Sequence, residues 1–313
     1  MAVESVIGAD IYNLPEDCIA TALSLTTPKD ACRLMLVASN FRSAAQFDAV
    51  WERFLPLDYR DLISRAANSG DLLAFASKKD LYFYLCDHHI IIDDGTKSFS
   101  LEKESGKKCY MLAAKSLQIV WGNDTRYWKW ISLAESRFSE AVELLDVCWF
   151  EIWGKINTKM LSPGTNYAAY LVFTARPGIT GFESQPLEAS IRIGEQEATT
   201  RTVYLDPKGV VSWPRHSLGF HHNEPQWARR MGLFRSRTLQ NANAAAAAPE
   251  NNGDEQPKKR EDKWMEVELG EVFIRDGGKE EDCIDISLKE VKGGHWKSGI
   301  IVLGIEIRPK WSK

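Results

Sequence analysis

The chain has 313 residues, of which 44% are hydrophobic, so it is long enough to form one large and one small domain with buried cores. Its 39 basic and 43 acidic residues give a formal net charge of −4, which excludes a general electrostatic attraction to nucleic acid or to an anionic membrane. The six cysteines include no C-x-x-C pair, and the first residues contain Glu4 and Asp10 but no unbroken apolar stretch. We therefore expect reduced cysteines, no signal peptide, no membrane span, and a location in the cytoplasm, the nucleus or both.

The first part of the chain, residues 11 to 55, carries the start signals of short helices. A proline and two acidic residues at 15–17 suit a first helical turn, and Thr27 followed by Pro28 suits the start of a second helix. Apolar residues then recur at three- and four-residue spacing through 31–41, which predicts one apolar face along that second helix. This face can pack within the helical domain itself or against a partner protein.

The spacing of this stretch resembles that of the F-box. It opens with Leu14-Pro15, continues through Pro28-Lys29-Asp30 and Leu36-Val37-Ala38-Ser39, and ends at Val50-Trp51. The resemblance implies a three-helix module at 8–55 that docks on a Skp-type adaptor and, through it, on a cullin. The side chains implied in this contact are Leu14, Pro15, Ile19, Leu23, Pro28, Leu36, Val37, Phe41 and Trp51.

Residues 56 to 97 predict a helical linker that fixes the angle between two domains. The pairs His88-His89 and Asp93-Asp94 within it have side chains of the types that bind metals. Adjacent side chains point in different directions on a helix or a strand, however, and no further ligand set accompanies them. We therefore expect neither a metal nor a cofactor.

From Phe99 onward the pattern changes to strands. Short apolar runs recur between Gly, Pro, Asn or Asp, and several of them alternate apolar and polar residues, as in 265–269 and 301–306. Regular helical crossovers do not separate these runs, so the sequence predicts an antiparallel β-sandwich over 98–313. The expected fold class is α+β in two domains, a small all-α domain followed by the sandwich.

Residues 208–263 interrupt the strand pattern as a long insertion that we expect to be mobile. The segment contains ten basic and six acidic residues, including the cluster Lys258-Lys259-Arg260. That cluster can act as a nuclear-import signal, and the residues around Trp227 can form an amphipathic helix that contacts a partner or lipid. A solvated basic loop is the simpler interpretation.

The chemically informative feature of the sandwich is aromatic. The sequence has no P-loop, no dinucleotide fingerprint, no G-x-S-x-G elbow and no H-E-x-x-H, so we expect a non-catalytic protein. Five tryptophans lie close together in the sequence: Trp121, Trp128, Trp130, Trp149 and Trp153. The C–H face of a sugar ring stacks on an indole, and its hydroxyls bond to groups such as the Asn123 amide in a polar turn. The same tryptophans can instead fill the core of the sandwich.

Several runs in this region match a lectin family. They are the runs at 99–114, 117–121, 127–130, 264–271 and 304–310. These runs resemble the phloem-protein-2 or Nictaba-type lectin domain, in the plant subfamily that carries an F-box in front of it. The resemblance implies a jelly-roll-like lectin fold. It also implies that Trp121 and Trp128, which match two tryptophans important in the family, bind N-acetylglucosamine oligomers or N-glycan cores. With Asn123 and Trp130 they form the expected carbohydrate site.

The two resemblances together predict the substrate-recognition subunit of an SCF-type (cullin-RING) ubiquitin ligase. In this prediction the F-box binds the adaptor and the sandwich binds a glycan on the target protein, without catalysis in this chain. Two alternatives stay open. One is a receptor that recognises a protein surface without sugar, and the other is a stress-related lectin whose F-box is degenerate.

Overall fold

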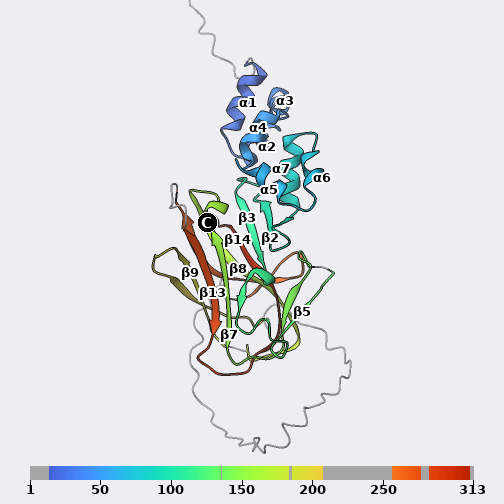
Figure 1. Ribbon diagram of the computed structural model, residues 1–313. Coiled ribbons are helices and arrows are strands. Elements are labelled where there is room, and N and C mark those ends of the chain that lie inside the picture. Colours follow the sequence, from blue (N-terminus) through green and yellow to red (C-terminus); the bar gives the residue numbers. More distant parts are fainter. Residues whose placement is uncertain (1–13, 135, 183–184, 207–255, 276–281, 311–313) are drawn as a thin grey trace, which may run out of the picture.

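Figure 1 shows the computed structural model of the chain, which describes residues 14–134, 136–182, 185–206, 256–275 and 282–310. Helices form the first part of the described chain and a mostly antiparallel sheet domain follows, which confirms the predicted α+β fold. Most of the expected insertion, including the region around Trp227, lies outside the described residues.

The helical part has more helices than the sequence predicts. Its helices are α1 (Glu16–Ser24), α2 (Pro28–Leu34), α3 (Ser39–Ala44), α4 (Asp48–Phe54), α5 (Tyr59–Ser64), α6 (Ser69–Leu73) and α7 (Lys78–Asp87). The expected continuous helix over 31–41 is wrong, because the backbone of Ala38 is extended (φ −154°, ψ 159°) and a new helix starts after it. The Asn40 side chain accepts a hydrogen bond from the Phe41 N–H, a local bond that competes with a continuous helix. Leu36 and Val37 therefore lie in a turn between α2 and α3.

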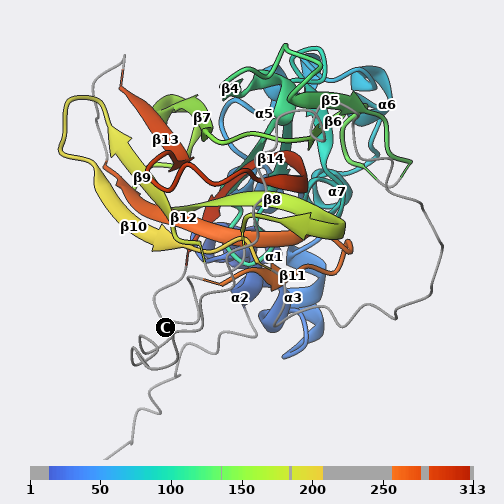
Figure 2. The ribbon, with the colours of Figure 1, turned by 90° about the horizontal axis from the view of Figure 1, so that it is seen from below.

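The sandwich is built from two sheets. Its strands are β1 (Ile90–Ile92), β2 (Lys97–Leu101), β3 (Lys108–Ala113), β4 (Gln118–Ile119), β5 (Trp128–Ile131), β6 (Ala141–Leu144), β7 (Phe150–Asn157), β8 (Thr165–Thr180), β9 (Leu187–Ile193), β10 (Thr199–Val203), β11 (Lys258–Lys259), β12 (Met265–Ile274), β13 (Cys283–Glu290) and β14 (Ser298–Pro309). The larger sheet runs β1-β2-β3-β14-β8-β12-β11, with β5 and β6 joined to β14 through β6, and the smaller runs β10-β9-β13-β7-β4. Seen from below, β9 and β13 lie in one layer and β8, β12 and β14 in the other (Figure 2).

Two expected boundaries differ from the structure. The range 56–97, expected to be a helical linker, ends in a strand, because Ile90–Ile92 pairs with β2 and adds an edge to the larger sheet. The range 208–263, expected to be an insertion, ends in β11, where Lys258 pairs with Glu266 of β12. Three consecutive isoleucines favour a strand that is buried on both faces, whereas the two lysines of β11 carry no strand signal of their own.

The helices and the sandwich share one core. Trp51 of α4 is fully buried, with its ring 5.3 Å from that of Tyr82 in α7. The Tyr82 hydroxyl donates to the Lys103 carbonyl in the turn between β2 and β3 (3.2 Å). In the same turn, Glu104 accepts hydrogen bonds from the backbone and side chain of Lys29 in α2. The turn between β2 and β3 thus joins the sandwich to α2 and α7.

Candidate functional site

The segment from Trp121 to Tyr127 forms a tight turn between β4 and β5. The Gly122 N–H donates to the Ile119 carbonyl (2.9 Å), and the Asp124 N–H donates to the Trp121 carbonyl (2.8 Å). These bonds hold Trp121 at a positive φ of 57°, which is unusual for a bulky residue and costs about 1–2 kcal/mol. Its indole is 44% exposed and lies 5.1 Å from the Tyr127 ring. The structure thus places an open aromatic surface at the position that the sequence predicts for sugar stacking.

Trp128 and Trp130 support this turn from behind. Trp128 is only 1% exposed, and its indole N–H donates to the Val120 carbonyl (3.0 Å). The Trp130 indole N–H donates in the same way to the Gly122 carbonyl (3.1 Å), and its ring is half-buried. The burial of Trp128 does not fit the prediction that its ring contacts sugar directly. Strand β5 points that side chain into the core against Phe150, so its role in the site is to fix the turn.

Among the polar residues of the turn, one is exposed and two pair with each other. Asn123 is exposed, as the prediction of a sugar-binding amide requires. Asp124 and Arg126 form an ion pair (2.6 Å), and the hydrogen bond from the Arg126 side chain lowers the pKa of Asp124 to about 2. Asp124 is therefore ionised near neutral pH, and the Arg126 guanidinium lies over the Tyr127 ring. Asn123 and the Trp121 indole are thus exposed groups of this turn that lie outside its ion pair.

Trp149 and Glu151 at the start of β7 lie next to the turn, and the sequence-based site leaves both out. The Val120 N–H donates to the Glu151 carbonyl (3.1 Å), which brings β7 beside the residue that precedes Trp121. Trp149 is 45% exposed, and its indole N–H donates to the Glu151 carboxylate (2.8 Å). The alternation of buried and outward residues through 150–157 is visible in the sequence and could have found this row.

The residues predicted to contact an adaptor divide into two groups. Ile19, Leu23, Pro28, Phe41 and Trp51 are buried and form the core of the helical domain. Leu14, Pro15, Leu36 and Val37 are exposed, and Leu36 and Val37 are 80% and 60% exposed. Of the side chains predicted to contact an adaptor, those open to a partner therefore lie in the turn between α2 and α3 and just before α1.

Metal and membrane sites are not found in the described part of the chain. Among the described residues, no group of three or more His, Cys, Asp and Glu side chains could hold a metal ion. None of the helices within the described ranges is long and apolar enough to cross a membrane.

A small helical domain followed by a β-sandwich with exposed aromatic residues defines a class of two-domain proteins, and comparison with known sequences agrees. Residues 11–53 match the F-box domain, and residues 107–309 match the family Phloem protein 2. The chain belongs to the phloem protein 2 family and carries an F-box in front of that domain.

Several Arabidopsis thaliana proteins are similar to this chain over nearly its whole length. "F-box protein PP2-B1" is 42% identical over 310 residues, covering 96% of this chain and 90% of the relative. "F-box protein At2g02240" is 43% identical, covering 96% and 80%, and "F-box protein PP2-B10" is 39% identical, covering 95% and 93%. The two-domain arrangement is thus common to this chain and its relatives.

Proposed function

We propose that this protein is the substrate-recognition subunit of an SCF-type ubiquitin ligase. The F-box docks on a Skp-type adaptor, which connects it to a cullin, and the sandwich holds the protein that is to be ubiquitylated. The observation that carries this proposal is the pair of exposed apolar side chains, Leu36 and Val37, in the matched F-box. Burying two such side chains against a partner supplies about 1.5–3 kcal/mol each, which favours docking.

We further propose that the ligand of the sandwich is a carbohydrate on the target protein, such as an N-acetylglucosamine oligomer or an N-glycan core. The exposed Trp121 indole supports this, because a flat aromatic face beside a polar turn suits both the C–H face and the hydroxyls of a sugar. The positive φ of Trp121 adds support, since strained backbone often marks a binding site. Ubiquitin transfer is then carried out by other subunits of the ligase.

The adaptor contact is tested by a pull-down of the full chain with a purified plant Skp-type adaptor. Leu36→Asp and Val37→Asp should each abolish capture, because a carboxylate would be buried in an apolar contact. Leu73→Asp is the matched control, since Leu73 is also exposed (59%) but lies in α6, beyond the F-box match. If the wild-type chain captures no adaptor, the F-box is degenerate and the protein acts as a lectin without the ligase.

The carbohydrate contact is tested by calorimetric titration of the full chain with the N-acetylglucosamine trimer. Trp121→Ala should weaken binding by about 1–3 kcal/mol, the scale of an aromatic contact in a small site. The control is Phe273→Ala, because Phe273 is also exposed (53%) but lies on β12, outside the turn between β4 and β5. Equal binding by wild type and Trp121→Ala would remove the turn from the site.

A further inference from the structure

The smaller sheet has an outer face that turns away from the core, and its side chains form regular rungs across the strands. The middle rung runs from β4 to β10 through Gln118, Trp153, Ser287, Ser190 and Thr200. All of these residues are exposed or half-buried, while their neighbours along β7, β9 and β13 are buried. We call this surface the outer sheet face.

The middle rung combines one indole with small uncharged polar groups. Trp153 is 36% exposed, and its partner across the strand pair is Ser287. The Ser287 hydroxyl is hydrogen-bonded to that of Ser190 (2.8 Å). Serines are too short to cover the neighbouring indole, so the rung leaves an aromatic surface open beside hydroxyl and amide groups.

The rungs on either side carry charges that neutralise each other. On one side, Lys289 contacts Glu188 (2.8 Å), and on the other Asp285 contacts Arg192 (2.9 Å). The hydrogen bond from Lys289 lowers the pKa of Glu188, so this carboxylate stays an ionised hydrogen-bond acceptor near neutral pH. A face whose charges are already paired favours a neutral ligand over a polyanion such as nucleic acid.

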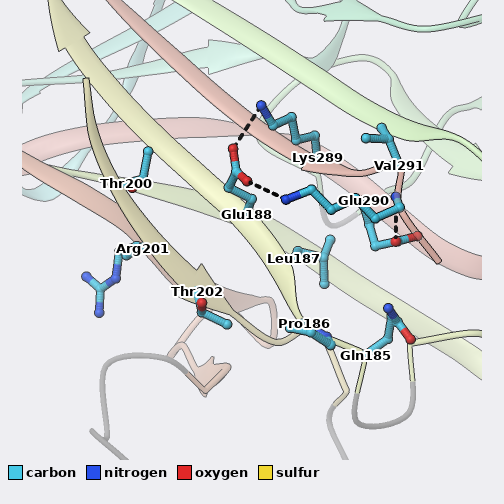
Figure 3. Close-up of a pocket in the computed structure, with 11 residues that line it drawn as sticks. Gln185, Pro186, Leu187, Glu188, Thr200, Arg201, Thr202, Lys289, Glu290 and Val291 are labelled. Atoms are coloured by element: carbon cyan, nitrogen blue, oxygen red, sulfur yellow. Dashed lines mark hydrogen bonds and ion pairs between the residues drawn. The ribbon is translucent and has the colours of Figure 1, made fainter. Parts of the chain in front are cut away.

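A hollow of about 400 Å³ opens at the end of the face formed by β9, β10 and β13. Figure 3 shows Glu188 and Lys289 joined across it, with Thr202 and Gln185 nearby and Arg201 pointing away. Thr202 is the partner of Glu188 in the strand register, so the hollow continues the charged rung beside Trp153. Its volume lies in the range of small-ligand sites, and its lining offers donors and acceptors.

The face is also continuous with the turn at Trp121. Gln118, which pairs with Trp153, belongs to β4, and Trp121 follows two residues after that strand. Trp149 immediately precedes β7 and its indole N–H donates to the Glu151 carboxylate, and Trp153 follows two residues later on the same outward side of β7 as Glu151. A chain of sugar units can therefore leave the turn and cross this row of indoles.

We propose that the outer sheet face is a second carbohydrate subsite, which takes the units of a neutral glycan beyond those bound at Trp121. Trp153 stacks on one sugar ring, and Lys289, Glu188 and Thr202, which lie on the successive strands β13, β9 and β10, hydrogen-bond the hydroxyls of the units that follow. Sugars suit this surface because a sugar ring has both an apolar C–H face and hydroxyl groups, and the rung offers an indole beside hydroxyl and amide groups. This inference rests on the proposed carbohydrate function and assigns that function a second set of residues.

The experiment compares two ligands, the dimer and the hexamer of N-acetylglucosamine, titrated into the full chain by calorimetry. Trp153→Ala and Thr202→Val are the test variants, Trp121→Ala removes the turn, and Phe273→Ala is the matched control on the other sheet. Trp153→Ala should weaken hexamer binding about tenfold and leave dimer binding within about twofold of wild type. Thr202→Val should weaken hexamer binding about threefold, because it replaces a hydroxyl by a methyl group of similar size.

Each outcome decides between the two sites. If hexamer binding by Trp153→Ala and Thr202→Val equals that of the control, the outer sheet face is not a subsite, while the site at Trp121 stands. If Trp121→Ala leaves hexamer binding unchanged and Trp153→Ala weakens it, the outer sheet face stands and the site at Trp121 fails. If neither ligand gives heat with the folded wild-type chain, both carbohydrate assignments are wrong, although adaptor capture would be unaffected.

Discussion

Two tryptophans seven positions apart have opposite environments, one buried and one exposed, so replacing them should change the free energy of unfolding by different amounts. Trp128 is buried and hydrogen-bonded to Val120, and Trp128→Ala should lower the free energy of unfolding by about 3–5 kcal/mol. Trp121 is exposed and sits in a strained backbone, so Trp121→Ala should change that free energy by less than about 1 kcal/mol. Urea unfolding of both variants measures the difference. A stable Trp128→Ala would show that this indole is not a core residue.

A second residue-scale prediction concerns the buried carboxylate of Glu306 on β14. Burial alone would raise its pKa, but the guanidinium groups of Arg260, Arg137 and Arg308 more than offset this and hold it at about 2, below the usual 4.5. Glu306 therefore stabilises the fold fully above about pH 4.5, and this contribution is lost as the pH falls from 4.5 toward 2.

Urea unfolding across that pH range tests the Glu306 prediction. Wild type should lose stability steeply below pH 4.5, and Glu306→Gln should be less stable near pH 7 and lose less on acidification. The exposed Glu195→Gln serves as the control and should follow the wild-type curve. Parallel curves for wild type and Glu306→Gln would show that other groups cause the acid sensitivity.

At the scale of elements, the turn between β2 and β3 depends on Gly106. Gly106 has a φ of +70°, and a Cβ there would lie 2.7 Å from the Phe54 carbonyl oxygen of α4. Gly178 also has a positive φ (+90°), but no atom lies within 4 Å of its Cβ position. Gly106→Ala should therefore destabilise the chain by about 1–3 kcal/mol more than Gly178→Ala, which adds only backbone strain. If urea unfolding shows that both variants lose the same free energy of unfolding, the turn can move away from α4.

Most elements of the fold follow from local patterns, and the exceptions have identifiable causes. Alternation predicts β12 and β14, and the Thr27 cap predicts the start of α2. The hairpin of β1 and β2 also has a signal in the sequence, since Asp94-Gly95, a pair typical of tight turns, lies between the two strands. Strand β11 has no such signal, because only pairing with β12 makes a strand of two lysines.

The sequence predicts where the candidate site lies, but not which of its side chains are exposed. The sequence predicts a polar turn directly after Trp121, and the structure has this turn but begins it at Trp121 itself. It could not predict that Trp128 is buried, because this depends on the Val120 carbonyl and the Phe150 ring, contacts that form only in the folded sandwich. The exposed indoles of Trp149 and Trp153 become part of one surface only when β7 pairs with β4 and β13.

At the scale of the molecule, the shared core fixes the helical domain and the sandwich relative to each other. The helices lie at one end of the sandwich, and β5, which begins after the turn at Trp121, lies at the end away from α1 and α3 (Figure 1). Ring contacts between Trp51 and Tyr82, and the hydrogen bond from Tyr82 to the β2–β3 turn, make the junction a packed interface. The proposed function requires such a junction, because a ligase subunit must present its target at a defined distance from the adaptor.

Such a junction predicts that the two domains unfold together. Calorimetry of the full chain should give one transition whose calorimetric and van't Hoff enthalpies agree, and Trp51→Ala should lower its midpoint without splitting it. A fragment of residues 98–313 lacks β1, which pairs with β2, and lacks Tyr82, which contacts the β2–β3 turn. We expect this fragment to melt about 10 °C or more below the full chain, since a loss of about 4 kcal/mol lowers the midpoint by about 8–16 °C at this size. Two separate transitions in the full chain, with the upper one equal to that of the fragment, would mean that the domains are independent and that the glycan is not held at a fixed distance from the adaptor.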